Sequence, residues 1–110
     1  MKLPKAEHAV VDVAKLRDYC LNPNHPRGRH KARVFLAALG MTAADAVSLC
    51  DALLAAARTE DATSRDLDEY GQRYVLDFLM TGPAGRANVR SVWIVRVGED
   101  GPRLSTCYVL

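Results

Sequence analysis

One change in the spacing of apolar residues constrains the fold of this chain more than any other feature of its sequence. Up to residue 57 the apolar residues recur every three or four positions, and from residue 74 they fall at every second position. The first pattern is typical of amphipathic helices and the second of half-buried strands. A polar stretch, residues 58–68, separates them. The chain is therefore predicted to have an α+β fold, with N-terminal helices packed on a C-terminal antiparallel sheet.

Three helices are expected, over about residues 13–21, 29–39 and 43–58. Capping residues support these bounds, because side chains of Ser, Thr, Asp and Asn begin helices, glycine ends them, and the residue before proline leaves the helical region. The residues concerned are Asp12, Pro23, Gly40, Thr42 and Asp45.

Three strands are expected after the helices. Residues 74–80 and 87–97 form a hairpin around the turn sequence TGPAGR, and residues 104–110 follow a second turn, GEDGP. Short connections favour an antiparallel meander with the helices on one face. Because three strands make a small sheet, we expect a fourth short strand near the N-terminus or a homodimer across an exposed edge.

The length of 110 residues, 49% of them hydrophobic, suits one domain over residues 1–110. Three cysteines, Cys20, Cys50 and Cys107, are far apart and flanked by apolar residues, which predicts buried, reduced thiols and a cytoplasmic location. No apolar run approaches the roughly 20 residues needed to cross a bilayer, and the charged start MKLPKAEH does not resemble a signal peptide. No membrane association is expected.

Charge is distributed unevenly along the chain, although the formal net charge is only +2. Between Lys15 and Arg33 six basic residues oppose one acid, and between Met41 and Tyr70 seven acids oppose two arginines. The small total therefore hides a dipolar molecule, and the basic segment is the part that could attract an anionic partner.

The segment from His25 to Arg33 places cations in the first turn of a helix, where each is unfavourable by about 0.3 to 1 kcal/mol. An anion bound there would reverse this effect, since backbone N–H groups, a close approach at Gly28 and arginine side chains would converge on one phosphate or carboxylate. The segment is interpreted as an anion site. The alternative is an ordinary solvated face, with Arg33 paired to an acid of the next helix.

Histidine titrates near neutral pH, so His25 or His30 beside a phosphodiester could act as a general acid or base. Lys31 could stabilise charge developing on the phosphorus oxygens. Strict alternation places Tyr108 on the face of Leu104, which favours core packing for Tyr108. No metal-binding or nucleotide-binding motif occurs, so neither a metal nor another cofactor is expected.

Several longer stretches resemble a family of small uncharacterised bacterial proteins over essentially the whole chain. They are LRDYCLNPNHPRGRHKARVF, LGMTAADA, YGQRYVLDF, VRSVWIVR and RLSTCYVL. The order of helices and strands is also similar to that of metal-independent ribonuclease toxins of the barnase, EndoU, colicin and RelE type. In such nucleases the RNA 2′-hydroxyl attacks its own phosphate.

This second resemblance implies roles for individual residues. His30 and Lys31 would be the acid/base and charge-stabilising pair, with Thr106 and Tyr108 as contacts on the sheet side. The catalytic candidates are thus His30, Lys31, Thr106 and Tyr108, and the phosphate-binding candidates are His25, Arg27, Gly28, Arg29, Arg33 and Arg90.

Two functions of different classes remain open at this point. The first is a ribonuclease-like toxin module acting on RNA and held in check by a small acidic antitoxin protein. The second is a non-catalytic domain that binds an anion or another protein, with the last strand or the hairpin as a dimer edge. Fold alone does not choose between them.

Overall fold

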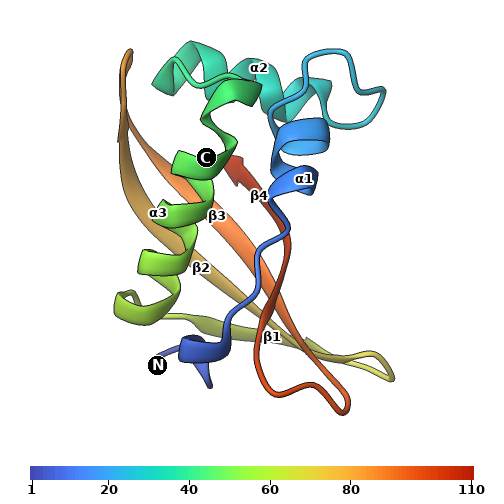
Figure 1. Cartoon of the computed structure of the whole chain (residues 1–110). Coiled ribbons are helices and arrows are strands. Elements are labelled where there is room, and N and C mark those ends of the chain that lie inside the picture. The colour runs from blue at the N-terminus through green and yellow to red at the C-terminus, as the bar shows by residue number, and fades with distance from the viewer.

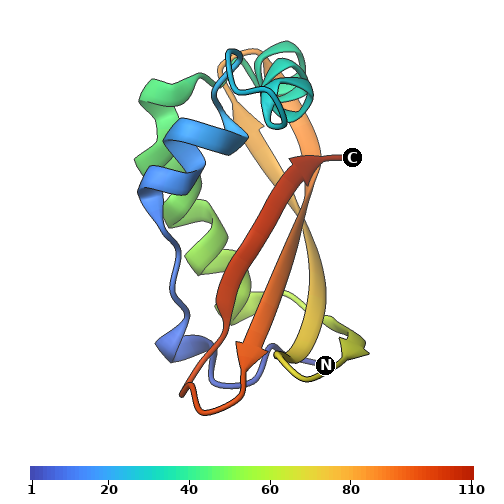
Figure 2. The same ribbon diagram turned by 90° about the vertical axis from the view of Figure 1, so that its right-hand side faces the viewer.

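The computed structural model describes all 110 residues and has two layers, helices on one face of a four-stranded sheet. Figure 2 shows α1 and α3 along one side of the sheet and α2 at the upper end of the strands. The strands are β1 (Thr63–Leu67), β2 (Gly71–Gly82), β3 (Gly85–Arg96) and β4 (Arg103–Val109), in the order β1-β2-β3-β4, and all neighbours are antiparallel. The predicted fold class and meander are confirmed.

The helical layer agrees with the capping signals in the sequence. It contains the short turn η1 (Ala6–His8), α1 (Val13–Lys15) running into the π-helical turn η2 (Leu16–Cys20), α2 (Arg29–Leu39), and η3 (Ala43–Asp45) running into α3 (Ala46–Thr59). The Asp12 carboxylate accepts the Ala14 N–H at 3.0 Å, and Thr42 and Asp45 form a reciprocal capping box. Gly40 ends α2 in the left-handed conformation, with φ of 70°.

The fourth strand is β1. It was expected near the N-terminus, but it lies inside the polar stretch of residues 58–68. All five of its residues are exposed, so it has no apolar alternation for sequence analysis to detect. Its place is set by backbone pairing with β2. Near the N-terminus only isolated bridges occur, from Lys2 to Asp61 and from Val10 to Arg103.

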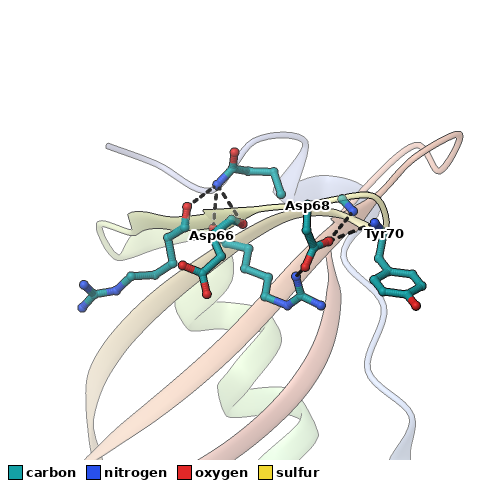
Figure 3. Close-up of polar contacts among 7 residues, drawn as sticks. Asp66, Asp68 and Tyr70 are labelled. Atoms are coloured by element: carbon teal, nitrogen blue, oxygen red, sulfur yellow. Dashed lines mark hydrogen bonds and ion pairs between the residues drawn. The ribbon is translucent and has the colours of Figure 1, made fainter.

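The turn between β1 and β2 is held by side chains that bond to the backbone (Figure 3). The Asp68 carboxylate accepts the N–H groups of Tyr70 at 2.9 Å and Gly71 at 3.3 Å, and it also pairs with the Arg73 guanidinium. The Gln72 amide donates to the Arg65 carbonyl at 2.8 Å. These bonds compensate for the lack of buried side chains on β1.

The turn between β2 and β3 fixes the position of α2. The Ala84 N–H in this turn donates to the Leu39 carbonyl at 3.1 Å, and a Cβ on Gly82 would lie 2.2 Å from the same carbonyl oxygen. Glycine is therefore required at position 82 for the turn to approach the helix. Figure 1 shows the result, with α2 at one end of the sheet, close to the C-terminus that follows β4.

A β-bulge changes which face of β4 meets the core. Val92 pairs with Thr106 but Trp93 pairs with Leu104, which leaves Ser105 without a partner. Leu104 and Cys107 are consequently both buried, while Tyr108 lies on the opposite face of the sheet. The prediction that Tyr108 shares the face of Leu104 is wrong, because it assumed an uninterrupted alternation.

The core lies between the sheet and the helices, with Trp93 fully buried at its centre as part of one continuous apolar cluster. The hydroxyl of buried Ser91 has two hydrogen-bond partners. It donates to the Leu76 carbonyl at 2.7 Å and accepts the Trp93 indole N–H at 2.8 Å. All three cysteines are buried and free, as predicted.

No single helix is long and apolar enough to cross a membrane. Helix α2 and residues 43–59 meet that criterion only when taken together, and a bend of 79° separates them.

Candidate functional site

The first turn of α2 is organised by the ring of His25. Its Nδ1 accepts the backbone N–H groups of Arg27 and Gly28, each at 3.0 Å, while its carbonyl accepts the Arg29 N–H at 3.0 Å. The ring also meets Tyr19 edge-on, with 4.6 Å between ring centroids. Two of the N–H groups expected to face an anion are thus used within the protein, and His25 has a structural role at this turn.

Gly28 is likewise explained by packing. It is buried, and a Cβ at this position would lie 2.1 Å from the Tyr19 carbonyl oxygen. The loop can therefore reach the π-helical turn η2 only if residue 28 has no side chain. Gly28 therefore allows the loop to pack on η2. Its backbone N–H already donates to His25 Nδ1 and is not free to bind an external anion.

The side chain of Lys31 connects α2 to the edge strand β4. Its ammonium donates to the Thr106 hydroxyl at 3.1 Å and lies 5.2 Å from the centre of the Tyr19 ring and 5.7 Å from that of Tyr108. Two aromatic faces and one hydroxyl hold the cation in place. No carboxylate lies within ion-pair distance of Lys31, so its charge is available to an anion.

His30 lies beside this cation, on the wall of a shallow surface hollow of about 270 Å³. The hollow is lined by His30, Lys31, Val34, Tyr108 and Val109. One wall is α2 and the other is the end of β4. The structure therefore brings the four catalytic candidates from the sequence, two on each element, to one place at the edge of the sheet.

Arg90 lies next to this hollow on the outer face of the sheet, directly opposite Tyr108 in the pairing of β3 with β4. Its guanidinium makes a two-pronged contact with the Asp77 carboxylate, with both N···O distances 2.9 Å. The Asp77 carboxylate, with a further contribution from Tyr108, raises the pKa of Arg90 above its ordinary value. Conversely Arg90 lowers the pKa of Asp77.

The remaining arginines do not converge on the hollow. Arg27, Arg29 and Arg33 are exposed and have no ion-pair partner. Two residues along a helix are about 200° apart around its axis, so Arg33 lies across α2 from Lys31. It lines a different, mostly apolar hollow of about 300 Å³, which also involves Leu36 and Met41. The pairing of Arg33 with an acid of the next helix, which belonged to the alternative of a solvated face, is absent.

Comparison with known proteins places the whole chain in one family. A family model described as a domain of unknown function, DUF6883, matches residues 2–110. The chain belongs to the DUF6883 family. The resemblance to a family of small uncharacterised proteins is thereby confirmed, and no curated protein matches the sequence.

The fold of this DUF6883 domain also occurs in a solved structure of a protein complex. One chain of a contact-dependent growth inhibition toxin–immunity protein complex from Klebsiella pneumoniae 342 superposes with a TM-score of 0.70 at 21% sequence identity. The match covers 92% of this chain and 99% of that chain. At this identity the likeness establishes a shared fold.

Two residues of the DUF6883 site were not predicted from the sequence. Tyr19 supports both His25 and Lys31, and Asp77 holds Arg90. Tyr19 sits on a short helix with no local motif, and Asp77 looks like the polar half of an alternating strand. The role of Asp77 becomes clear only from its position opposite Arg90, which depends on the register in which β2 pairs with β3.

The chemistry available at the α2–β4 hollow is that of an imidazole, an ammonium and hydroxyl groups. No group of three or more His, Cys, Asp or Glu side chains is placed to hold a metal ion. An imidazole can exchange a proton near neutral pH, and a fixed ammonium can stabilise negative charge on a phosphorus oxygen.

Proposed function

We propose that this DUF6883 domain is a ribonuclease-like toxin module that cleaves RNA phosphodiesters without a metal ion, at the hollow between α2 and β4. The observation that carries the proposal is the convergence of residues about 75 positions apart in sequence. Lys31 contacts Thr106 at 3.1 Å, and His30 and Tyr108 line the same hollow. The fold shared with a chain of a toxin–immunity protein complex also fits a role in such a pair of proteins.

In the proposed reaction the RNA 2′-hydroxyl attacks the adjacent phosphorus, and the 5′-oxygen of the next nucleotide leaves and takes a proton from water. His30 accepts the proton of the 2′-hydroxyl as general base. Lys31 stabilises the negative charge that develops on the oxygens of the pentacoordinate phosphorus. Because Lys31 is already held by Tyr19, Tyr108 and Thr106, little reorganisation is needed as that charge forms. The products are a 2′,3′-cyclic phosphate and a 5′-hydroxyl.

Binding of the RNA backbone is assigned to Arg90, beside the hollow, and to the exposed arginines at the start of α2. Arg90 stands beside Tyr108 with its orientation set by Asp77, so it can contact a phosphate while remaining paired. Arg27 and Arg29 extend from the start of α2 without acidic partners. Phosphate contacts of this kind position RNA and make binding sensitive to salt.

An acidic antitoxin protein is the proposed partner. The exposed cations at the start of α2 favour a carboxylate-rich contact face, and the mostly apolar hollow bordered by Arg33 and Leu36 offers a place for an apolar side chain of that protein. A partner that extends from there across the exposed side of α2 would block the entrance to the α2–β4 hollow. The variant Arg33→Glu, at the border of this apolar hollow, is expected to escape neutralisation by a cognate antitoxin while keeping its toxicity.

Growth arrest during induced expression in bacteria tests the proposed toxin. The wild-type chain is expected to stop growth and His30→Ala to relieve the arrest at an equal level of folded protein. His8→Ala is the matched control, because His8 is exposed on η1 at the other end of the molecule from α2. Normal growth with the wild type, or arrest that persists in His30→Ala, would leave the non-catalytic interaction domain as the better description.

A further inference from the structure

Two of the three cysteines are chain neighbours of the residues that contact Lys31. Cys20 is the last residue of η2, and Cys107 is the residue of β4 between Thr106 and Tyr108. Both side chains are fully buried. Nothing in the proposed reaction uses them, and Cys107 faces the core opposite Ser91.

The contacts of Lys31 show that the two segments carrying these cysteines lie together. Its ammonium touches the rings of Tyr19 and Tyr108, which immediately precede Cys20 and follow Cys107. A second lysine, Lys15, donates to the Ser105 carbonyl and ties the start of η2 to the same strand. Both thiols are buried in the same apolar cluster, and each is the main influence on the pKa of the other.

The two thiols differ in acidity in the way that disulfide chemistry requires. The hydrogen bond from Cys107, with help from the charges of Lys31 and Lys15, lowers the pKa of Cys20 to about 7. The same contact and burial raise the pKa of Cys107. Cys20 is therefore the more acidic thiol of the pair and the one expected to supply the thiolate nucleophile, while Cys107 keeps its proton longer.

We propose that Cys20 and Cys107 are a redox modification site, a dithiol that hydrogen peroxide or a similar two-electron oxidant converts into an intramolecular disulfide. The Cys20 thiolate attacks one peroxide oxygen, the O–O bond breaks, and a sulfenic acid and hydroxide form, which a proton turns into water. The Cys107 sulfur then attacks the Cys20 sulfur, loses its proton and displaces the sulfenic hydroxyl as a second water. The two cysteines lose two electrons in total, and the peroxide gains them.

The disulfide would tie η2 to the edge strand β4 below Lys31 and Thr106. Closing so long a loop restricts the unfolded chain strongly, so the oxidised form is expected to unfold at a higher temperature. Because both sulfurs are buried, oxidation proceeds through local opening of η2 or of the edge strand. Cys50, on α3, has no thiol neighbour and should remain reduced.

Intact-mass measurement of the reduced, native chain after exposure to hydrogen peroxide tests this site. The incubation is run about 10 °C below the melting temperature, where local opening is frequent. The expected result is a loss of about 2 Da, with a Cys20–Cys107 cross-link in the proteolytic map. The melting temperature should rise by about 5 °C or more.

The Cys50→Ser variant is the matched control and should form the same cross-link, whereas Cys20→Ser and Cys107→Ser should not. A wild-type product with no cross-link, with sulfinic acid on Cys20, or with Cys50 in the bridge would overturn the proposal. The mass measurement on the wild-type chain decides this even if a serine variant fails to fold. It is independent of RNA cleavage, so either proposal can fail alone.

Discussion

The Lys31 ammonium lies 3.1 Å from the Thr106 hydroxyl, which joins the start of α2 to the edge strand β4 across 75 positions of sequence. Lys31 is held there without a carboxylate partner, between the rings of Tyr19 and Tyr108. A cation placed in this way stabilises the fold only modestly, and it is available to an anionic ligand.

Gly28→Ala is expected to destabilise the protein by about 2 to 3 kcal/mol, because the new Cβ would overlap the Tyr19 carbonyl oxygen. Chemical denaturation measures the free energy of unfolding. Gly98→Ala is the comparison: its Cβ would meet no atom within 4 Å, and only its φ of 85° is unfavourable, at about 1 kcal/mol. Equal losses in the two variants would mean that the loop is not packed on η2 as described.

His25→Ala is expected to lower the free energy of unfolding by about 1 kcal/mol, since the Arg27 and Gly28 N–H groups lose their acceptor. His30→Ala is the matched control. His30 is exposed and its side chain makes no hydrogen bond within the protein, so its loss should leave the thermal melt unchanged. A large loss of stability in His30→Ala would show that this histidine is structural.

The double variant Arg27→Ala/Arg29→Ala should keep the wild-type melting temperature or raise it slightly, because two cations that oppose the dipole of α2 are removed. Its affinity for an RNA analogue with 2′-deoxy substitutions, which cannot be cleaved, should fall, and wild-type binding should weaken as salt increases. Fluorescence anisotropy measures both. A clear fall in stability with unchanged binding would indicate that these arginines are structural.

The Asp77–Arg90 pair should contribute to the dependence of stability on pH. The neighbouring Arg90 lowers the pKa of Asp77 below its ordinary value of 3.8, so the unfolded state binds a proton more readily than the native state. The contribution is present above the ordinary pKa and is lost as pH falls through the lowered one. Asp77→Asn should therefore lose less stability than the wild type on acidification below about pH 4. Asp51→Asn, at an exposed position of α3, is the control and should lose as much stability as the wild type on acidification.

Much of the fold follows from local signals in the sequence. The capping residues at Asp12, Gly40 and Thr42 mark helix ends because they satisfy backbone groups locally, and the alternation along residues 87–97 reflects a strand with one face on the core. Neither signal depends on distant contacts. The strand β1 was missed because both of its faces are exposed, and strand pairing leaves no trace in such a sequence.

The site could be predicted only in part. The cations at the start of α2 were notable because they oppose the helix dipole, a local argument that indicated His30 and Lys31. The face of Tyr108 was predicted wrongly, since the bulge at Ser105 comes from the pairing of β4 with β3 and not from residue types. The functions of Tyr19 and Asp77 depend on neighbours that are remote in sequence.

Cleavage of RNA by the purified protein, with analysis of the new ends, tests the central claim most directly. The wild type is expected to generate 2′,3′-cyclic phosphate and 5′-hydroxyl ends in the presence of a chelator. His30→Ala and Lys31→Ala should each lose about 100-fold or more in rate, whereas His8→Ala should keep the wild-type rate. Absence of cleavage by the wild type, or cleavage that survives both substitutions in α2, would contradict the assignment of this hollow as a ribonuclease site.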